Sequence, residues 1–350
     1  MLAFTESIFI KMGCSIENAQ KSAQALISAD LRGIDSHGVA RLNGYVRLWE
    51  NGRLKTNPNC VIEHETPSTA VLNGDSGVGL LVAQEAMHIA IKKASKVGTG
   101  WVAVNNSNHF GIAGFHAMLA LQNDMIGIAM TNASAIVSPT YSKEKRLGTN
   151  PIAMAIPAGK EKPFIADFAT TTASNGKLEI LQRLNKKTPA GWVQDELGNP
   201  SKDAHILKKG GAMLPLGSNK EHGSHKGYAL GSMVDILSGV LSGGNYGPWV
   251  APFPAYIPIP KNQPNKGVGH FLGAMRIDAF QSKENFKKNM DKWIKSMKNA
   301  APINAQNQVL IPGDMERQYE IERIKNGIPL LEEITIQLNI LAERFNLTKL

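Results

Sequence analysis

The sequence predicts an α+β protein in which both chain ends form one helical domain and a β-rich domain is inserted between them. Three observations favour this class. Apolar residues recur at helical spacing toward both ends, short apolar runs typical of strands gather in the middle, and 350 residues exceed the usual size of a single core. We therefore predict a discontinuous helical domain of residues 1–72 and 285–350, with an α+β domain of residues 73–284.

The first half of the chain alternates predicted helices and strands. Residues 15–31 form an amphipathic helix, because Ala19, Ala23 and Leu26 recur on one side. The turn GDSGVG then opens a helix that ends near residue 97. Four apolar runs predict strands, with a brief helix between the first two; they are residues 101–105, 125–132, 151–157 and 163–170.

The second half returns to helices. A long helix is predicted from Lys226 to Leu241, with Met233, Ile236 and Val240 facing the core, and a strand follows over 270–280. Three further helices are predicted at residues 282–299, 314–327 and 330–345. In the first of these, lysines form the solvated face and four apolar residues form the core stripe, namely Phe286, Met290, Ile294 and Met297.

Composition narrows the compartment of the protein. Only two cysteines, Cys14 and Cys60, accompany thirteen methionines, which is typical of a reducing compartment. The first residues contain Glu6 and no basic segment, so a signal peptide is not predicted. The longest uncharged run, 236–260, is broken by prolines and glycines, so a membrane span is not predicted either. We expect a cytoplasmic protein without membrane partners.

The net charge of +9 is the feature that would suit nucleic acid. The lysines, however, are dispersed or lie on helix faces, and a small anionic substrate or a phosphate cofactor needs only a few of them. We expect no nucleic-acid partner, and a basic anion- or nucleic-acid-binding protein is the alternative class.

The common nucleotide signatures do not occur in the sequence. GVGHFLG (267–273) resembles a dinucleotide fingerprint, but its third glycine comes one residue late and a predicted strand follows it instead of a helix. No GxxxxGK[ST] segment is present. A dinucleotide would therefore bind outside a Rossmann turn.

Two histidines lead to an acid–base hypothesis. In DLRGIDSHGVAR, His37 lies beside Asp35 and Ser36, and Arg41 follows four residues later, where a helix would place it to hold a carboxylate. The competing interpretation is a capped helix end with a solvated imidazole. His109 directly follows a predicted strand, and its polar neighbours NNSN would either fix its tautomer or only satisfy the turn.

Two later segments could bind anions, and a histidine pair could bind a metal ion. Residues 167–177 leave a strand into hydroxyls and a lysine, which suit a pyrophosphate but are also typical of an ordinary loop. Ser224, His225 and Lys226 precede a helix, whose N-terminus attracts anions. His222 and His225 form an HxxH pair without further ligands at metal spacing, so no metal site is predicted and a zinc hydrolase is only a third alternative.

Six segments together resemble the type-2 malate/L-lactate dehydrogenase family of non-Rossmann, NAD(P)-dependent oxidoreductases. They are DLRGIDSHGVARL, NSNHFGIAGF, LGTNPIAMAIPA, DFATTTASNGK, HKGYALGSMVDILSGVLSGG and VLIPGDMERQYEIERIKNGIPL, in this order from about residue 20 onward. The resemblance implies a homodimer whose inserted domain binds NAD or NADP. It also implies oxidation or reduction of small 2-hydroxy or 2-oxo acids, malate before the alternatives of L-lactate, sulfolactate, cyclic imino acids and keto-sugar acids.

The resemblance also assigns roles to residues. His37 and His109 match the histidines of proton transfer, and Arg41 matches the arginine that meets the substrate carboxylate. The substrate pocket would include Ser36, Thr149 and Asn150. The cofactor would contact Asp167, Thr171, Thr172, Ser174, Gly176, His225, Lys226, Pro312, Gly313 and Asp314.

One loop departs from the family pattern. SPTYSKEKR (138–146) is charged, whereas many relatives have a short glycine-rich turn there. We expect Lys143, Lys145 or Arg146 to meet a second substrate carboxylate, such as that of malate. The choice between NAD and NADP stays open at this point.

Overall fold

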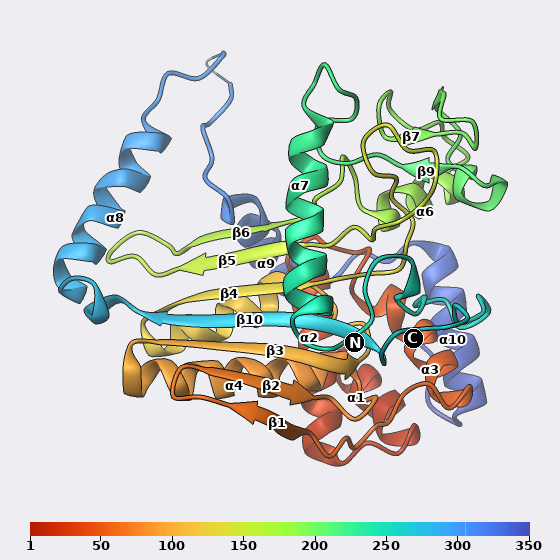
Figure 1. The fold of residues 1–350 in the computed structure, drawn as a ribbon, viewed down its shortest axis with the longest axis horizontal. Helices are drawn as coiled ribbons and strands as arrows, with labels where there is room; N and C mark the ends of the chain where they lie inside the picture. Colours follow the sequence, from red (N-terminus) through yellow and green to blue (C-terminus); the bar gives the residue numbers. More distant parts are fainter. Residues whose placement is uncertain (305) are drawn as a thin grey trace.

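The computed structural model describes residues 1–304 and 306–350, and within them the centre is a seven-stranded sheet (Figure 1). Across the sheet the strands are β1 (Val61–Glu65), β2 (Thr69–Asn73), β3 (Thr99–Ser107), β10 (Val268–Arg276), β4 (Met125–Thr131), β5 (Ile152–Ile156) and β6 (Phe164–Phe168). β2 and β3 pair in parallel, and the other neighbours are antiparallel. A Rossmann sheet is mostly parallel. This mixed α/β topology therefore agrees with the prediction that GVGHFLG is not a Rossmann fingerprint.

One face of the sheet is covered by helices that lie unusually close to it. α4 (Gly79–Val97) joins β2 to β3, and its buried side chains are mostly alanine, valine and leucine. A Cβ built on Gly100 of β3 would lie 2.0 Å from the Ala90 carbonyl oxygen. A Cβ on Gly127 of β4 would likewise meet the Ala117 carbonyl oxygen of α5 (Ala113–Met118) at 2.0 Å. These glycines therefore set the distance between helices and sheet.

Helices from both chain ends share a second core. α1 (Leu2–Lys11), α2 (Ile16–Leu31), α3 (Leu42–Glu50) and α10 (Glu332–Arg344) pack together through Phe9, Leu26, Tyr45 and Leu338. α9 (Asp314–Asn326) packs on α2. The helices predicted at 15–31, 314–327 and 330–345 are thus confirmed, while the division into two domains stays a prediction.

Two parts of the predicted helical domain lie elsewhere. β1 and β2 belong to the sheet, and α8 (Lys283–Lys298) packs against the β5–β6 turn, on the far side of the sheet from α10 (Figure 1). There the carboxylate of Asp291 accepts backbone N–H bonds from Gly159, Lys160 and Glu161. Of the predicted core stripe only Ile294 is buried, because the helix meets a narrow hairpin turn instead of a broad core.

The prediction of the long helix was right in extent and wrong in orientation. α7 (Ser224–Asp235) continues into a π-helical turn (Ile236–Val240) in front of the sheet in Figure 1. Met233, Ile236 and Val240 are more than half exposed, at 57%, 53% and 51%. Small residues lie on the inward face of the helix, because the backbone of Leu216 lies close against it. A Cβ on Gly227 would lie 2.3 Å from the Leu216 carbonyl oxygen.

A third, smaller core lies beside the sheet. β7 (Val193–Gln194), β8 (Pro200–Ser201), β9 (Ala212–Met213) and α6 (Asn175–Arg183) surround it, and it is formed by residues that include Val137, Leu178, Val193, Ile206 and Met213. The remaining short helical turns are η1 (Val39–Arg41), η2 (Leu119–Asn123), η3 (Ile206–Lys209), η5 (Gly247–Trp249) and η6 (Ile277–Ala279). No helix in residues 1–304 and 306–350 is both long and apolar enough to cross a membrane.

Candidate active site

Two imidazoles from distant parts of the chain stack on each other. The rings of His37, in the loop after α2, and His109, just after β3, lie 5.7 Å apart between centroids and are tilted by only 18°. Phe253 packs on His109 from another loop, with 4.5 Å between centroids. The structure therefore brings together both histidines that the sequence analysis singled out.

The loop of His37 is fixed by a buried carboxylate. Asp30, at the end of α2, accepts a 2.8 Å hydrogen bond from the backbone N–H of Val39. Gly38 between them has no room for a side chain, because its Cβ would lie 1.8 Å from an Asp30 oxygen. Ser36 Oγ lies 2.8 Å from His37 Nδ1, whereas Asp35 pairs with Arg323 and does not meet the ring.

His109 is oriented by a residue that the sequence analysis missed. The Tyr45 hydroxyl, on α3, lies 2.7 Å from His109 Nδ1, and Tyr45 is fully buried. The backbone N–H of Gly111 approaches the same nitrogen at 3.3 Å. A backbone N–H can only donate, so Nδ1 accepts and the neutral ring carries its proton on Nε2. Tyr45 lies one helical turn after Arg41, at the start of α3, and this spacing could have signalled it.

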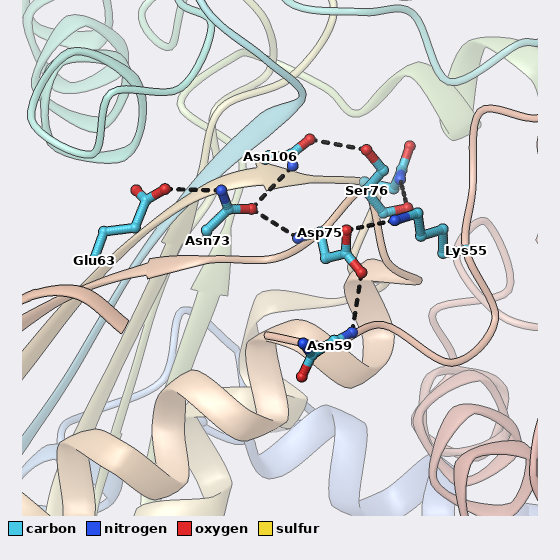
Figure 2. A network of polar contacts seen from close by, with 8 residues as sticks. Lys55, Asn59, Glu63, Asn73, Asp75, Ser76 and Asn106 are labelled. Atoms are coloured by element: carbon cyan, nitrogen blue, oxygen red, sulfur yellow. Dashed lines mark hydrogen bonds and ion pairs between the residues drawn. The ribbon is translucent and has the colours of Figure 1, made fainter. Parts of the chain in front are cut away.

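The polar neighbours of His109 build the turn instead of contacting the ring. Asn108 donates to the carbonyl oxygens of Ser76 and Gly77, at 2.9 and 3.0 Å. Asn106 bonds to Ser76 and Asn73 in the network of Figure 2. The competing interpretation, that these residues satisfy the turn, is correct for both asparagines.

That network holds one sharp turn next to His109. Asp75 and Ser76 have positive φ angles of 51° and 56°, and Asp75 bonds Lys55 and the backbone of Asn59 (Figure 2). The turn leads into α4, whose Gly79 would place a Cβ 2.4 Å from the His109 carbonyl oxygen. The His109 backbone is therefore packed against a braced helix start.

The two histidines are neutral at physiological pH. Burial lowers the pKa of His37 to about 3, and the nearby Arg41 guanidinium adds to this. Burial lowers the pKa of His109 well below its usual value, with further contributions from His37 and Arg41. Because each charged ring disfavours the other, the pair holds at most one proton readily.

Arg41 is engaged by a carboxylate of the chain itself. Its guanidinium nitrogens lie 2.8 and 3.2 Å from the two carboxylate oxygens of Glu179 on α6, and its Nε donates to the Ser36 carbonyl oxygen at 2.6 Å. Gly176 lies against the same loop, since its Cβ would lie 2.2 Å from Ser36 Cβ. Glu179 was not predicted from the sequence, because its partner Arg41 is 138 residues away.

A cavity opens beside the histidine pair, and an arginine other than Arg41 lines it. Arg53, after α3, shares this cavity with His37 and His109. The other lining side chains are Leu48, Asn108, Phe110, Thr131, Asn132, Ser134, Thr149, Pro151, Pro252, Phe253 and Val268. Among the described residues, the lining includes no carboxylate.

The two residues of the predicted substrate turn, Thr149 and Asn150, lie in different environments. Thr149 lines the cavity. Asn150 is fully buried with a φ of 36°, accepts from the Ala133 N–H at 3.0 Å and donates to the Gly231 carbonyl oxygen at 2.9 Å. It therefore ties the turn to α7.

Most predicted cofactor positions gather where β6 ends. Thr171 pairs with Pro215, Thr172 donates to the Leu214 carbonyl oxygen, and the chain then turns into α6 at Ser174. His225 and Lys226 are exposed in the first turn of the neighbouring α7. The structure thus places hydroxyls, a helix N-terminus and a lysine side by side.

The other predicted cofactor positions are more distant or already satisfied. The Pro312 carbonyl oxygen accepts from Ile165, at the opposite end of β6, and Gly313 follows with a φ of 96°. Asp314 pairs with Lys298 and Arg317. Asp167 accepts the Gly114 N–H at 2.7 Å, and burial raises its pKa to about 6.

The alternative sites gain little from the structure. His222 lies beside Asn219, and no cluster of three or more His, Cys, Asp or Glu residues in the described chain could hold a metal ion. Arg146 pairs with Glu144, and the Lys145 ammonium bonds the Leu207 carbonyl oxygen. The charged loop does not line the histidine cavity, and its expected contact with a second substrate carboxylate stays a prediction.

Comparison with known proteins agrees with this architecture. Residues 1–339 match the family model of malate/L-lactate dehydrogenases. The chain is 42% identical to a malate dehydrogenase of Pyrococcus abyssi, over 98% of this chain and 93% of that protein. It is 39% identical to a malate/(S)-sulfolactate dehydrogenase of Methanothermus fervidus, over 96% of this chain and 94% of that protein.

Solved structures give the same result. The malate dehydrogenase of Pyrococcus horikoshii superposes with a TM-score of 0.89 at 38% identity, covering 100% of this chain and 94% of that one. That of Entamoeba histolytica gives 0.91 at 32% identity, covering 99% and 96%. This chain therefore belongs to the malate/L-lactate dehydrogenase family, a family of oxidoreductases that implies a nicotinamide cofactor.

Proposed function

We propose that this protein is an NAD(P)-dependent 2-hydroxyacid dehydrogenase that interconverts L-malate and oxaloacetate. The observation that supports it most is the stacked pair of neutral histidines beside a cavity that has an arginine and, among the described residues, no carboxylate. Such a cavity suits a small anion whose hydroxyl or carbonyl group exchanges a proton. Relatives named malate dehydrogenase, at 40–42% identity, favour malate as the substrate.

The histidine pair would handle the substrate proton. In oxidation, a neutral imidazole takes the hydroxyl proton, and in reduction the same ring returns it to the oxygen at C2. Ser36 can donate to His37 Nδ1 or accept from it, so it supports both charge states of that ring. Either His37 or His109 can be the group that moves the proton. The other ring then stays neutral, because a second charge in the pair is disfavoured.

The substrate carboxylate next to C2 would bind Arg41. Arg41 already forms a two-pronged pair with Glu179, and this pairing with a carboxylate supports the assignment. Substrate would then displace Glu179, with Ser36 and Thr149 close to the bound acid and Asn150 holding the turn of Thr149.

The residues at the end of β6 fit a nicotinamide dinucleotide. The exposed Lys226 and His225, the N-terminus of α7 and the hydroxyls of Thr172 and Ser174 suit its phosphates. When bound, the cofactor supplies or accepts the hydride at C2. Thr171, Gly176 and Asp167 would shape this binding segment, and Pro312, Gly313 and Asp314 would serve it only from a distance.

A homodimer would cover the exposed face of α7. Met233, Ile236, Val240 and Leu241 are each more than half exposed and lie on consecutive turns of one helix. An apolar surface of this kind is typical of a subunit interface. Light scattering on the purified protein would give the mass of one or two chains.

Turnover of a panel of 2-oxo acids tests the proposed function. Oxidation of NADH and of NADPH would be followed with oxaloacetate, pyruvate, sulfopyruvate, 2,3-diketogulonate and piperideine-2-carboxylate. We expect the highest kcat/KM with oxaloacetate, and the better reductant identifies the cofactor. Sulfopyruvate is the second candidate, because this chain is also similar to proteins named malate/(S)-sulfolactate dehydrogenase and L-sulfolactate dehydrogenase. Absence of nicotinamide binding, with salt-sensitive retention on heparin, would favour the basic binding protein instead.

A further inference from the structure

Arg53 is the charged residue of the histidine cavity that the chain leaves incompletely bonded. Its Nη2 donates to the Pro252 carbonyl oxygen at 2.5 Å, while its Nη1 is buried and has no hydrogen-bond partner among the described residues. A buried N–H without a partner costs about 1–3 kcal/mol, and more when the group is charged. A ligand that supplies an acceptor to this nitrogen would recover that energy.

The position of Arg53 is fixed on both sides. Its backbone N–H donates to the Leu48 carbonyl oxygen at 2.9 Å, and its carbonyl oxygen accepts from Asn108, the neighbour of His109. Pro252, which accepts from the guanidinium, precedes Phe253, whose ring packs on His109. These contacts fix the position of the guanidinium relative to His109.

The charge of the cavity has no internal counterpart. Arg53 is its permanent cation, both histidines are neutral, and the described residues that line it include no Asp or Glu. Arg41 differs in this respect, because Glu179 neutralises it and because it lies outside the lining of this cavity. The cavity thus attracts an anion to the side of the histidines where Arg53 lies.

We propose that Arg53 binds the second anionic group of the substrate and determines specificity for 2-hydroxy acids that carry one at C3. The proposal rests on the proposed function, and it replaces the charged loop 138–146 as the site for that group. Planar guanidinium groups bind both carboxylates and sulfonates through paired N–H donors. The substrate class is accordingly the malate type, with a carboxylate, or the sulfolactate type, with a sulfonate, and lactate lacks the group.

Three substrates and two variants test this proposal. Arg53→Gln should lower kcat/KM for oxaloacetate and sulfopyruvate at least tenfold and up to about a hundredfold, which is the value of a charged hydrogen bond. The same variant should change kcat/KM for pyruvate by less than about threefold. Arg53→Lys keeps the charge and should recover part of the loss. The ratio of the oxaloacetate and sulfopyruvate losses tells which anion the wild-type site favours.

Arg146→Gln is the matched control, since it removes a guanidinium from the surface loop that does not line the cavity. It should leave the ratio of oxaloacetate to pyruvate turnover unchanged. An equal loss on all three acids in Arg53→Gln, or an unchanged ratio, would overturn the role of Arg53.

Ligand-induced stabilisation separates this inference from the proposed function. L-Malate should raise the Tm of the wild type more than L-lactate does, and Arg53→Gln should abolish the difference. A wild type that turns over none of the acids but shows this difference would refute the dehydrogenase function and support the anion site. The opposite result is turnover of 2-oxo acids with equal stabilisation by malate and lactate, and with the same ratio of oxaloacetate to pyruvate turnover in Arg53→Gln as in the wild type. It would support the dehydrogenase function and refute the anion site.

Discussion

Tyr45→Phe removes one hydroxyl group from behind His109 and leaves the aromatic packing in place. The Tyr45 ring contacts Phe9 at 6.1 Å and Phe253 at 5.4 Å between centroids, and a phenylalanine keeps both contacts. What disappears is the hydrogen bond that the hydroxyl donates to His109 Nδ1 at 2.7 Å, together with its 3.2 Å contact with the His109 carbonyl oxygen. Only the longer Gly111 N–H contact, at 3.3 Å, then remains on that nitrogen.

The expected magnitudes follow from these contacts. Loss of one buried hydrogen bond, with its acceptor left poorly satisfied, should lower the free energy of unfolding by about 1–2 kcal/mol. If His109 moves the proton, loss of the bond that orients its ring should lower kcat by about tenfold to a hundredfold. This is at or below the ~10²–10⁴-fold contribution of an acid–base group itself.

Urea unfolding and the pH profile of kcat measure the two effects separately. Tyr256→Phe is the matched control, because Tyr256 is 73% exposed and should change neither quantity. A Tyr45→Phe protein with lowered stability but unchanged kcat and pH profile would refute the inference that Tyr45 orients a proton-transfer group. It would leave His37 as the histidine to test.

Three further changes have definite expected outcomes. Glu179→Gln should lower KM for the 2-oxo acid, because Arg41 then loses a competing carboxylate. Steady-state kinetics measure this KM. A raised KM would instead make Glu179 a positioning residue. Gly100→Ala should lower the free energy of unfolding by about 1–3 kcal/mol, since its Cβ would lie 2.0 Å from the Ala90 carbonyl oxygen; urea unfolding measures it, and a neutral result would contradict the close packing of α4. Burial lowers the pKa of His270 to about 3, so the unfolded chain binds a proton near pH 6.5 that the native state does not, and stability falls as the pH falls. His270→Gln should therefore reduce the loss of stability between pH 6.5 and 5 by about 2 kcal/mol, and parallel curves for the two proteins would contradict this.

Local pattern predicted several elements well, for a physical reason. The helix of residues 16–31 and the helix of residues 332–344 bury the apolar stripes that their spacing predicts, such as Ala19, Ala23 and Leu338. Such a stripe is favourable wherever one side of a helix meets a core, so neighbours along the chain suffice to predict it. His109 was singled out in the same way, because a turn that follows a strand often carries functional side chains, and its role stays a prediction.

Other features depend on partners that are distant in the sequence. α7 turns its glycines inward because the backbone around Leu216 lies against it, and no periodicity rule contains that neighbour. The mostly exposed α8 follows from meeting a hairpin turn, although its pattern predicts a core stripe. In both helices the packing surface, which the tertiary structure supplies, decided which face was buried.

The sequence by itself determined the class of the protein: its helical ends, its strand-rich centre, the exclusion of a Rossmann turn, and the pairing of a histidine with small polar neighbours at residues 35–38. Only the tertiary structure decided which groups meet. It placed Tyr45 behind His109, Glu179 on Arg41, and Arg53 in a cavity whose described lining residues include no carboxylate. Hydrogen bonds and charge pairs act over a few ångströms, and they join residues whose separation along the chain carries no information about their distance in space.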